Sequence, residues 1–134
     1  MTSQVNPIPE GYHTITPYLI VQEAEKLVDF VKQAFGAVEH FRGTGSAGGL
    51  HIEVSIGDSR VMIGGGGAWS GEPALATLYL YMDDVDTIYQ SALQAGASSI
   101  MEPADQSYGD RLGGVKDAFG NTWYIATHIE DVPL

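Results

Sequence analysis

The 134-residue sequence contains no cysteine and few basic residues. Without cysteine there is no disulfide, no thiolate nucleophile and no cysteine-ligated zinc, which suits a cytoplasmic protein. Seventeen acidic residues against six basic ones give a formal net charge of −11 at pH 7, and no segment concentrates lysine or arginine. Because such a surface repels phosphate groups and anionic lipids, we expect neither nucleic acid nor a membrane as a partner.

Long apolar runs are also lacking. Residues 1–11 are polar, include Pro7 and Pro9, and have no apolar stretch typical of a signal peptide. No segment has the roughly 20 apolar residues that a membrane-spanning helix needs. The length fits one domain with its own hydrophobic core, so residues 1–134 are expected to form a single domain.

Residues 108–128 form the most regular stretch of the sequence. A strand-like segment leads through Asp117 to a turn around Gly120, and residues 122–128 then alternate between two sets of side chains. This order predicts a β-hairpin. Residues 56–63 contain a shorter copy of the same order, which indicates an internal repeat.

The expected elements follow the same order twice. The first set is a strand at 13–21, a helix at 22–35 that ends at Gly36, and strands at 37–42, 50–56 and 60–63. The second set is a strand at 75–82, a helix that begins near Asp83 or Asp84 and ends at Gly96, and strands at 98–101, 111–116 and 122–128. The sequence therefore predicts tandem βαβββ modules at about 12–66 and 74–128, joined by a glycine-rich linker.

Three stretches, residues 16–37, 51–63 and 108–128, resemble the glyoxalase/bleomycin-resistance family, also called the vicinal oxygen chelate (VOC) superfamily. The resemblance covers about residues 15–128. It implies an α+β fold in which two βαβββ modules form a U-shaped mixed sheet around a pocket, with the helices on the outer face. It also implies a homodimer. Family members include isomerases, dioxygenases and drug-sequestering proteins, so the resemblance specifies the fold more narrowly than the function.

Metal-dependent members of this family carry histidine or glutamate at four positions on the first and last strands of the two modules. By the resemblance, these positions hold Thr16, Val61, Thr77 and Tyr124. Only the Tyr124 phenolate is an occasional ligand for a divalent metal. We therefore expect no cofactor at the usual site, while a divalent metal at another position stays an open alternative.

Strand alternation separates the apolar side chains that the helices cover from a second set that faces the expected pocket. Its members are mainly aromatic or carry hydroxyl groups, which suits a flat or amphipathic organic ligand. This expected pocket set is Thr16, Tyr18, His51, Glu53, Ser55, Val61, Ile63, Thr77, Tyr79, Tyr81, Thr122, Tyr124 and His128. In particular, Tyr79, Tyr124 and His51 are expected to line one cavity.

His51 and Glu53 are the leading candidates for catalysis, with Tyr124 as a third. Residues two apart on a strand share a face, so the imidazole and the carboxylate can reach a common ligand and act as base and acid. The alternative is that His51 and Glu53 only satisfy each other's hydrogen-bonding groups.

Arg111 is one of only six basic residues, and the family pattern implies that its strand faces the pocket. A guanidinium there would clamp a carboxylate or phosphonate of the ligand. The alternative is a surface ion pair between Arg111 and Asp110 or Glu102.

Three functions remain open from the sequence. The first is a metal-free protein that binds an aromatic or amphipathic small molecule. The second is a lyase, isomerase or dioxygenase-type enzyme that uses His51 and Glu53, or a metal at an unconventional site. The third is a homodimer with a vestigial pocket, whose surface contacts a protein partner. In each case a homodimer is expected, because the apolar, glycine-rich linker around Trp69 would otherwise stay partly uncovered.

Overall fold

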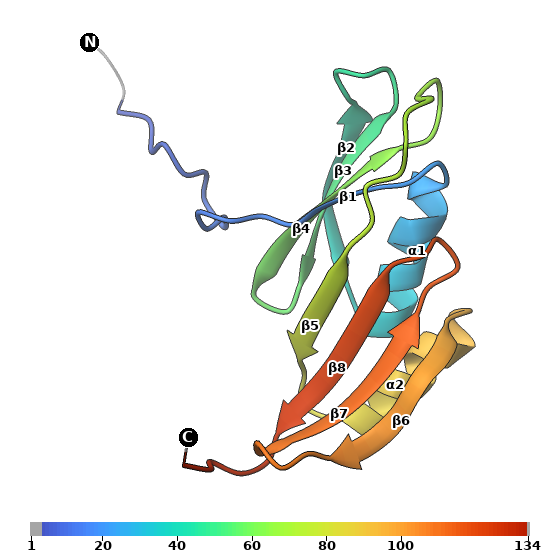
Figure 1. The fold of residues 1–134 in the computed structure, drawn as a ribbon. Helices are drawn as coiled ribbons and strands as arrows, with labels where there is room; N and C mark the ends of the chain where they lie inside the picture. The colour runs from blue at the N-terminus through green and yellow to red at the C-terminus, as the bar shows by residue number, and fades with distance from the viewer. Residues whose placement is uncertain (1–3, 134) are drawn as a thin grey trace.

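The computed structural model describes residues 4–133, which form two modules of the order strand, helix, strand, strand, strand. The first module contains β1 (Tyr18–Ile20), α1 (Ala24–Phe35), β2 (Val38–Thr44), β3 (Leu50–Ile56) and β4 (Ser59–Gly65). The second contains β5 (Thr77–Tyr81), α2 (Val85–Gln94), β6 (Ser98–Asp105), β7 (Asp110–Lys116) and β8 (Thr122–His128). The tandem βαβββ order predicted from the sequence is confirmed (Figure 1).

Each module forms its own four-stranded mixed sheet, with the strand orders β1-β4-β3-β2 and β5-β8-β7-β6. The first strand of each module runs parallel to the last, and the other pairs are antiparallel. The two modules lie one above the other in Figure 1. The α+β class is therefore confirmed. Neither helix within residues 4–133 combines the length and apolarity of a membrane span.

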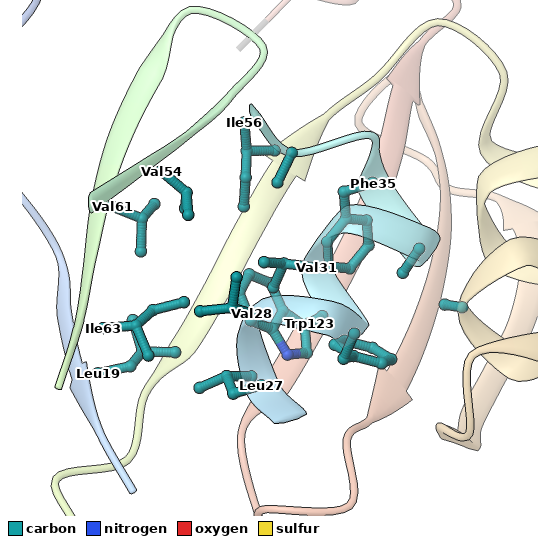
Figure 2. Close-up of a cluster of buried hydrophobic side chains, with 14 of the residues drawn as sticks. Leu19, Leu27, Val28, Val31, Phe35, Val54, Ile56, Val61, Ile63 and Trp123 are labelled. Carbon is teal, nitrogen blue, oxygen red and sulfur yellow. The ribbon is translucent and has the colours of Figure 1, made fainter. Parts of the chain in front are cut away.

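Helix α1 connects the cores of the two modules. Its apolar stripe, which includes Leu27, Val28 and Val31, is fully buried. Trp123 from β8 of the second module is also fully buried, and its ring centroid lies 4.9 Å from that of Phe35 at the end of α1. Figure 2 shows Trp123 beside α1, among the buried side chains of the first module. The indole therefore packs one module against the other.

The turn between β7 and β8 is organised by the buried carboxylate of Asp117. Its Oδ1 accepts hydrogen bonds from the backbone N–H groups of Phe119 and Asn121, both at 2.9 Å. Its Oδ2 accepts from the Asn121 amide at 3.0 Å and from the Trp123 indole at 2.8 Å. The Asn121 side chain accepts in turn from the backbone of Ala76 at 3.0 Å. These bonds satisfy buried polar groups and hold the hairpin on the core.

The structure corrects the expected orientation of β4. Val61 and Ile63 belong to the buried core and do not lie on the face expected from the sequence, although Val61 also lines a cavity next to β5. Met62 lies on the other face of the sheet, where it is the register partner of Glu53. The reason is burial, since this register places two β-branched apolar side chains in the core and leaves Arg60 and Met62 outside it.

Several predicted boundaries also change, and the largest changes are at β1, β4 and β6, of which β6 runs on to Asp105 instead of ending at residue 101. β1 begins at Tyr18 rather than at residue 13, and the side chain of Ile15 is 84% exposed. Gly64 and Gly65, which lie beyond the strand expected at 60–63, extend β4 and are buried. Gly65 has a φ of 111°, and a Cβ there would collide with the backbone carbonyl of Val21. This close approach of two backbones requires glycine.

Candidate functional site

The face of each sheet opposite its helix, called here the open face, carries polar and aromatic side chains. Along β3, alternation directs Ile52 into the core and leaves His51 and Glu53 partly exposed on the open face. Along β8, it directs Trp123 into the core and leaves Tyr124 on the open face. Each module therefore carries one group of polar and aromatic side chains on its open face, and the two are called here the first and the second polar group.

The first polar group consists of Tyr12, Tyr18, His51, Glu53 and Arg60. The Nε2 atom of His51 lies 3.0 Å from Oε2 of Glu53, and the Tyr18 hydroxyl lies 3.1 Å from His51 Nδ1. The other oxygen of Glu53 accepts a hydrogen bond from the Tyr12 hydroxyl. The Arg60 guanidinium lies over the Tyr12 ring, 5.1 Å from its centroid. Hydrogen bonds thus link Tyr18, His51, Glu53 and Tyr12 in one chain.

The charge state of this group follows from its hydrogen bonds. The bond from Tyr12 lowers the pKa of Glu53 although partial burial opposes the change. Burial, together with the bond to Glu53, raises the pKa of Tyr12 to about 12. Near neutral pH, Glu53 is therefore a carboxylate and Tyr12 a neutral donor. The His51 nitrogen that faces the Glu53 carboxylate consequently carries the proton.

A cavity of about 380 Å³ adjoins the first polar group. It lies between the chain that precedes β1 and the open face of the first module. Its lining is mostly apolar and contains one acid, Glu53. The lining residues are Pro7, Ile8, Pro9, Tyr12, His13, Thr14, Thr16, Glu53 and Met62. The expected pocket residue Thr16 does line a cavity, together with Glu53.

The second polar group consists of Tyr79, Tyr81, Tyr124, Asp110 and His128. Asp110 is only 2% exposed. Its Oδ2 accepts hydrogen bonds from the hydroxyls of Tyr79 at 2.6 Å and Tyr81 at 2.9 Å, and its Oδ1 lies 2.8 Å from His128 Nδ1. The ring centroid of Tyr79 lies 5.3 Å from that of Tyr81 and 6.2 Å from that of Tyr124. Three tyrosine rings thus surround one buried carboxylate.

This arrangement favours an anionic Asp110 with protonated neighbours. The hydrogen bond from Tyr79, followed by that from His128, lowers the pKa of Asp110. The bonds to Asp110 and then to Asp131, whose Oδ1 lies 2.7 Å from His128 Nε2, raise the pKa of His128. Burial and the bond to Asp110 raise the pKa of Tyr79. The tyrosine hydroxyls therefore stay donors to a carboxylate.

The two polar groups do not share a cavity in the single chain. A cavity of about 460 Å³ between the β3–β4 turn and β5 includes Tyr79 and Tyr81 but neither His51 nor Tyr124. The cavity next to Glu53 includes neither Tyr79 nor Tyr124. The expectation that His51, Tyr79 and Tyr124 line one cavity is therefore not met within one chain, because the modules pack through α1 and Trp123 and each keeps its own open face.

Arg111 lies on the opposite face from the one expected. Alternation along β7 places Asp110 in the second polar group and directs Arg111 toward α2. There its guanidinium bonds Asp86 on α2 at 3.0 and 3.1 Å and Asp105 on β6 at 3.0 Å. Both carboxylates are well exposed, so this is a surface ion-pair network. The clamp role is thus not supported by the geometry, and the partners differ from Asp110 and Glu102.

Three members of the polar groups, Tyr12, Arg60 and Asp110, lie outside the set predicted from the sequence. Arg60 was missed because the expected orientation of β4 placed Val61 and Ile63 on the open face in its stead. Asp110 carried a usable signal, because the hairpin register that pairs Lys116 with Thr122 extends to pair Asp110 with His128. The sequence contains no signal for Tyr12. This residue precedes β1, and it contacts Glu53 only because the irregular segment before β1 folds back over the sheet.

The residues at the four expected metal positions, Thr16, Val61, Thr77 and Tyr124, offer two hydroxyls, one aliphatic side chain and one phenol, and this set does not fit a divalent metal. Their neighbours in the parallel strand pairs add no better ligand. On the open face, the parallel strand pairs bring together Tyr18 with Met62 and Tyr79 with Tyr124. Thr77 is paired with Thr122 at the start of β8. Hydroxyl and thioether groups are poor ligands for zinc, nickel or iron. Both nitrogens of His128 already face carboxylates. Within residues 4–133, no three histidine or acidic side chains gather as a metal site.

Comparison with known proteins agrees with this fold. The family model of the Glyoxalase/Bleomycin resistance protein/Dioxygenase superfamily matches residues 11–125, and the chain belongs to this superfamily. The uncharacterized protein Mb0911c of Mycobacterium bovis is 35% identical over 133 residues, which cover 90% of this chain and 86% of the relative. The family resemblance seen in the sequence is therefore confirmed.

Solved structures with the same fold are more distant in sequence. TioX from Micromonospora sp. ML1 is similar with a TM-score of 0.71 and 22% identity, covering 87% of this chain and 99% of TioX. The fosfomycin resistance protein FosX from Mesorhizobium loti is similar with a TM-score of 0.63 and 17% identity, covering 90% of this chain and 93% of FosX. At these identities the similarity shows the fold alone.

Proposed function

We propose that the protein binds an aromatic or amphipathic organic molecule on its open face, without the metal ion of the metal-dependent family members. The observation that carries the proposal is the second polar group. Tyr79 and Tyr81 are 43% and 64% exposed, so their rings offer apolar surface to a ligand while their hydroxyls are fixed by Asp110. Rings held in place in this way bind a flat partner with little loss of side-chain freedom.

The hydrogen bonds of the second polar group also indicate which polar groups the ligand should carry. The hydroxyl protons of Tyr79 and Tyr81 are donated to Asp110, so the lone pairs of these hydroxyls are the groups left to accept. The anionic Asp110 and the net charge of −11 favour a donor or a cation over an anion. The preferred ligand is therefore an aromatic molecule that carries N–H or O–H donors or a positive charge.

A homodimer is part of this proposal. In one chain the two open faces carry separate polar groups, and large apolar side chains stay exposed near both of them, including Phe41 beside His51 and Tyr81 beside Tyr79. A second copy that covers these faces would remove that surface from water. Light scattering should then give about twice the 14.3 kDa of one chain, whereas a monomer at every accessible concentration would contradict the dimer.

The binding proposal is tested by titration of aromatic amines and matched aromatic carboxylates in the presence of a chelator. We expect amines to bind more tightly than carboxylates. Tyr124→Leu should weaken binding about 3- to 10-fold, the loss of one ring contact. Ile100→Ala on neighbouring β6, which removes an exposed apolar side chain outside the group, should not. Equal binding by the wild type and Tyr124→Leu would reject the site.

The hydrogen-bonded chain of Tyr18, His51 and Glu53 favours a second candidate, an enzyme of the isomerase or lyase type with His51 as the base. Mass spectrometry of ligands incubated with the protein distinguishes the two. Turnover that is lost in His51→Gln, while binding persists, would favour the enzyme. Ligands recovered unchanged would favour binding alone.

A further inference from the structure

The chain before β1 crosses the open face of the first module. Residues 7–16, called here the strap, run as an irregular segment outside the two sheets, at the start of the blue part of the chain in Figure 1. A turn closes on the backbone bond from Tyr12 N–H to the Pro9 carbonyl at 3.0 Å. No side chain in residues 7–16 is buried in the core, which begins at Leu19. The strap can therefore move without opening the core.

Tyr12 makes the specific contacts of the strap. Its hydroxyl donates to Glu53, and the Arg60 guanidinium lies 5.1 Å from the centre of its ring. Gly11 lies against this guanidinium. A Cβ at this position would lie only 2.7 Å from an Arg60 nitrogen, so the lack of a side chain allows the close approach. These contacts use only the phenol ring and its hydroxyl, so a free phenol is able to make all of them.

We infer that the open face of the first module is a binding site for phenols, and that the chain's own Tyr12 occupies it in this structure. Glu53 supplies the acceptor for the phenol hydroxyl, and Arg60 supplies a cation over the ring. His51 holds Glu53 from the other side. The apolar wall of the adjoining cavity, which includes Pro7, Ile8 and Met62, accommodates an apolar substituent on the ring.

A phenolic ligand therefore competes with Tyr12 and releases the strap. This inference goes beyond the proposed function, since it concerns Glu53 and Arg60 of the first module rather than Tyr124 and Asp110 of the second. It also assigns the strap a role as an internal competitor. The apparent affinity of the wild type for a phenol is then the intrinsic affinity multiplied by the fraction of chains in which Tyr12 is released.

The test is titration of 4-methylphenol into the wild type and Tyr12→Ala, followed by ligand-observed NMR. We expect Tyr12→Ala to bind 4-methylphenol at least ~10-fold more tightly than the wild type, because its site is empty. Toluene, which lacks the hydroxyl, should bind Tyr12→Ala at least ~10-fold more weakly than 4-methylphenol, and Glu53→Ala added to Tyr12→Ala should remove this preference. Equal affinities of wild type and Tyr12→Ala would overturn the inference.

A second measurement uses the wild type alone. The strap contains one glutamate, Glu10, so a glutamate-specific protease reports its release by cleavage after this residue. Cleavage there should accelerate with 4-methylphenol and not with toluene. Tyr124→Leu, in the other polar group, should leave this acceleration unchanged. If Tyr124→Leu abolishes it, or if 4-methylphenol leaves the cleavage rate unaltered, the phenol site is not at Glu53.

Discussion

The two modules hold the acid on their open face in different ways. Glu53 is hydrogen-bonded by His51 on its own strand and by Tyr12, which lies outside the βαβββ repeat. Asp110 is hydrogen-bonded by side chains of β5 and β8, within its own module. The Glu53 side chain is 23% exposed and that of Asp110 only 3%. The same fold thus gives one site that an external segment completes and one that is complete in itself.

The hairpin turns of the two modules also differ, because only the turn of the second module is held by buried hydrogen bonds of its own. The β3–β4 turn is a two-residue turn in which Gly57 has a φ of 57°, and the exposed Asp58 bonds only the neighbouring Ser59 hydroxyl, at 3.2 Å. The β7–β8 turn contains the buried Asp117, which accepts from two backbone groups and from the side chains of Asn121 and Trp123. The second turn is therefore part of the core, whereas the first is surface.

The largest effect on stability is expected when the buried carboxylate of the β7–β8 turn is removed. Asp117→Ala leaves the buried donors of Asn121 and Trp123 without an acceptor, at about 1–3 kcal/mol each, so the free energy of unfolding should fall by at least ~2 kcal/mol. The matched control Asp58→Ala should change it by less than about 0.5 kcal/mol. Urea unfolding followed by fluorescence measures both. Similar losses for the two variants would show that the turns are equivalent.

A smaller effect is expected from pH. Between neutral and alkaline pH it is expected in the second polar group, where the pKa of His128 is raised. The folded pKa of His128 is raised above its ordinary value of about 6.5, so its stabilising contribution is complete below that value and is lost as the pH rises through the folded pKa. Asp110 and Asp131 are the acids that face it. The lowered pKa of Asp110 acts on the acid side, where stability is lost as the pH falls below about 4.

We therefore expect the melting temperature of the wild type to fall more than that of His128→Gln between about pH 6 and pH 9. The control is His40→Gln, because Nε2 of His40 lies 2.9 Å from a hydroxyl, that of Ser55, whereas His128 faces two carboxylates. This variant should keep the wild-type pH profile. Parallel profiles for the wild type and His128→Gln would mean that the ion pair with Asp110 does not stabilise the fold.

The sequence predicts the repeating parts of this molecule better than the parts that depend on distant contacts. The bounds of β3 and β8 agree with the residues that alternate in the sequence, and Gly36 ends α1 in the left-handed conformation expected of a C-cap glycine. These features depend on local periodicity and backbone geometry. The register of β4 does not, because apolar residues stand at Val61, Met62 and Ile63 in succession and only packing against α1 decides which of them are buried.

The candidate sites, too, were predicted only as far as local periodicity determines them. Alternation assigned His51, Glu53 and Tyr124 to the correct face of each sheet, because one face of each strand packs on a helix. Tyr12 required knowledge of the path of the strap, and the separation of the two polar groups required the packing of Trp123 against α1. Neither follows from spacing along the chain.

The smallest effect is expected at Arg111, a predicted pocket residue that lies on the helix side of its sheet and forms ion pairs there. Its partners Asp86 and Asp105 are 57% and 66% exposed, so water and salt screen these ion pairs and their net contribution to stability is small. Arg111→Met keeps the aliphatic length of the side chain and removes the charge. Its melting temperature should fall slightly at low ionic strength and match the wild type at 1 M salt.

Ligand binding separates the two possible roles of Arg111 more sharply than stability does. Because its guanidinium points toward α2 and away from the second polar group, Arg111→Met should bind aromatic amines and aromatic carboxylates with wild-type affinities. Tyr124→Leu, measured in parallel, should weaken the same amines. If Arg111→Met instead lost affinity for carboxylates and kept it for amines, the guanidinium would have to reach the ligand, and the ion pairs with Asp86 and Asp105 would have to break on binding.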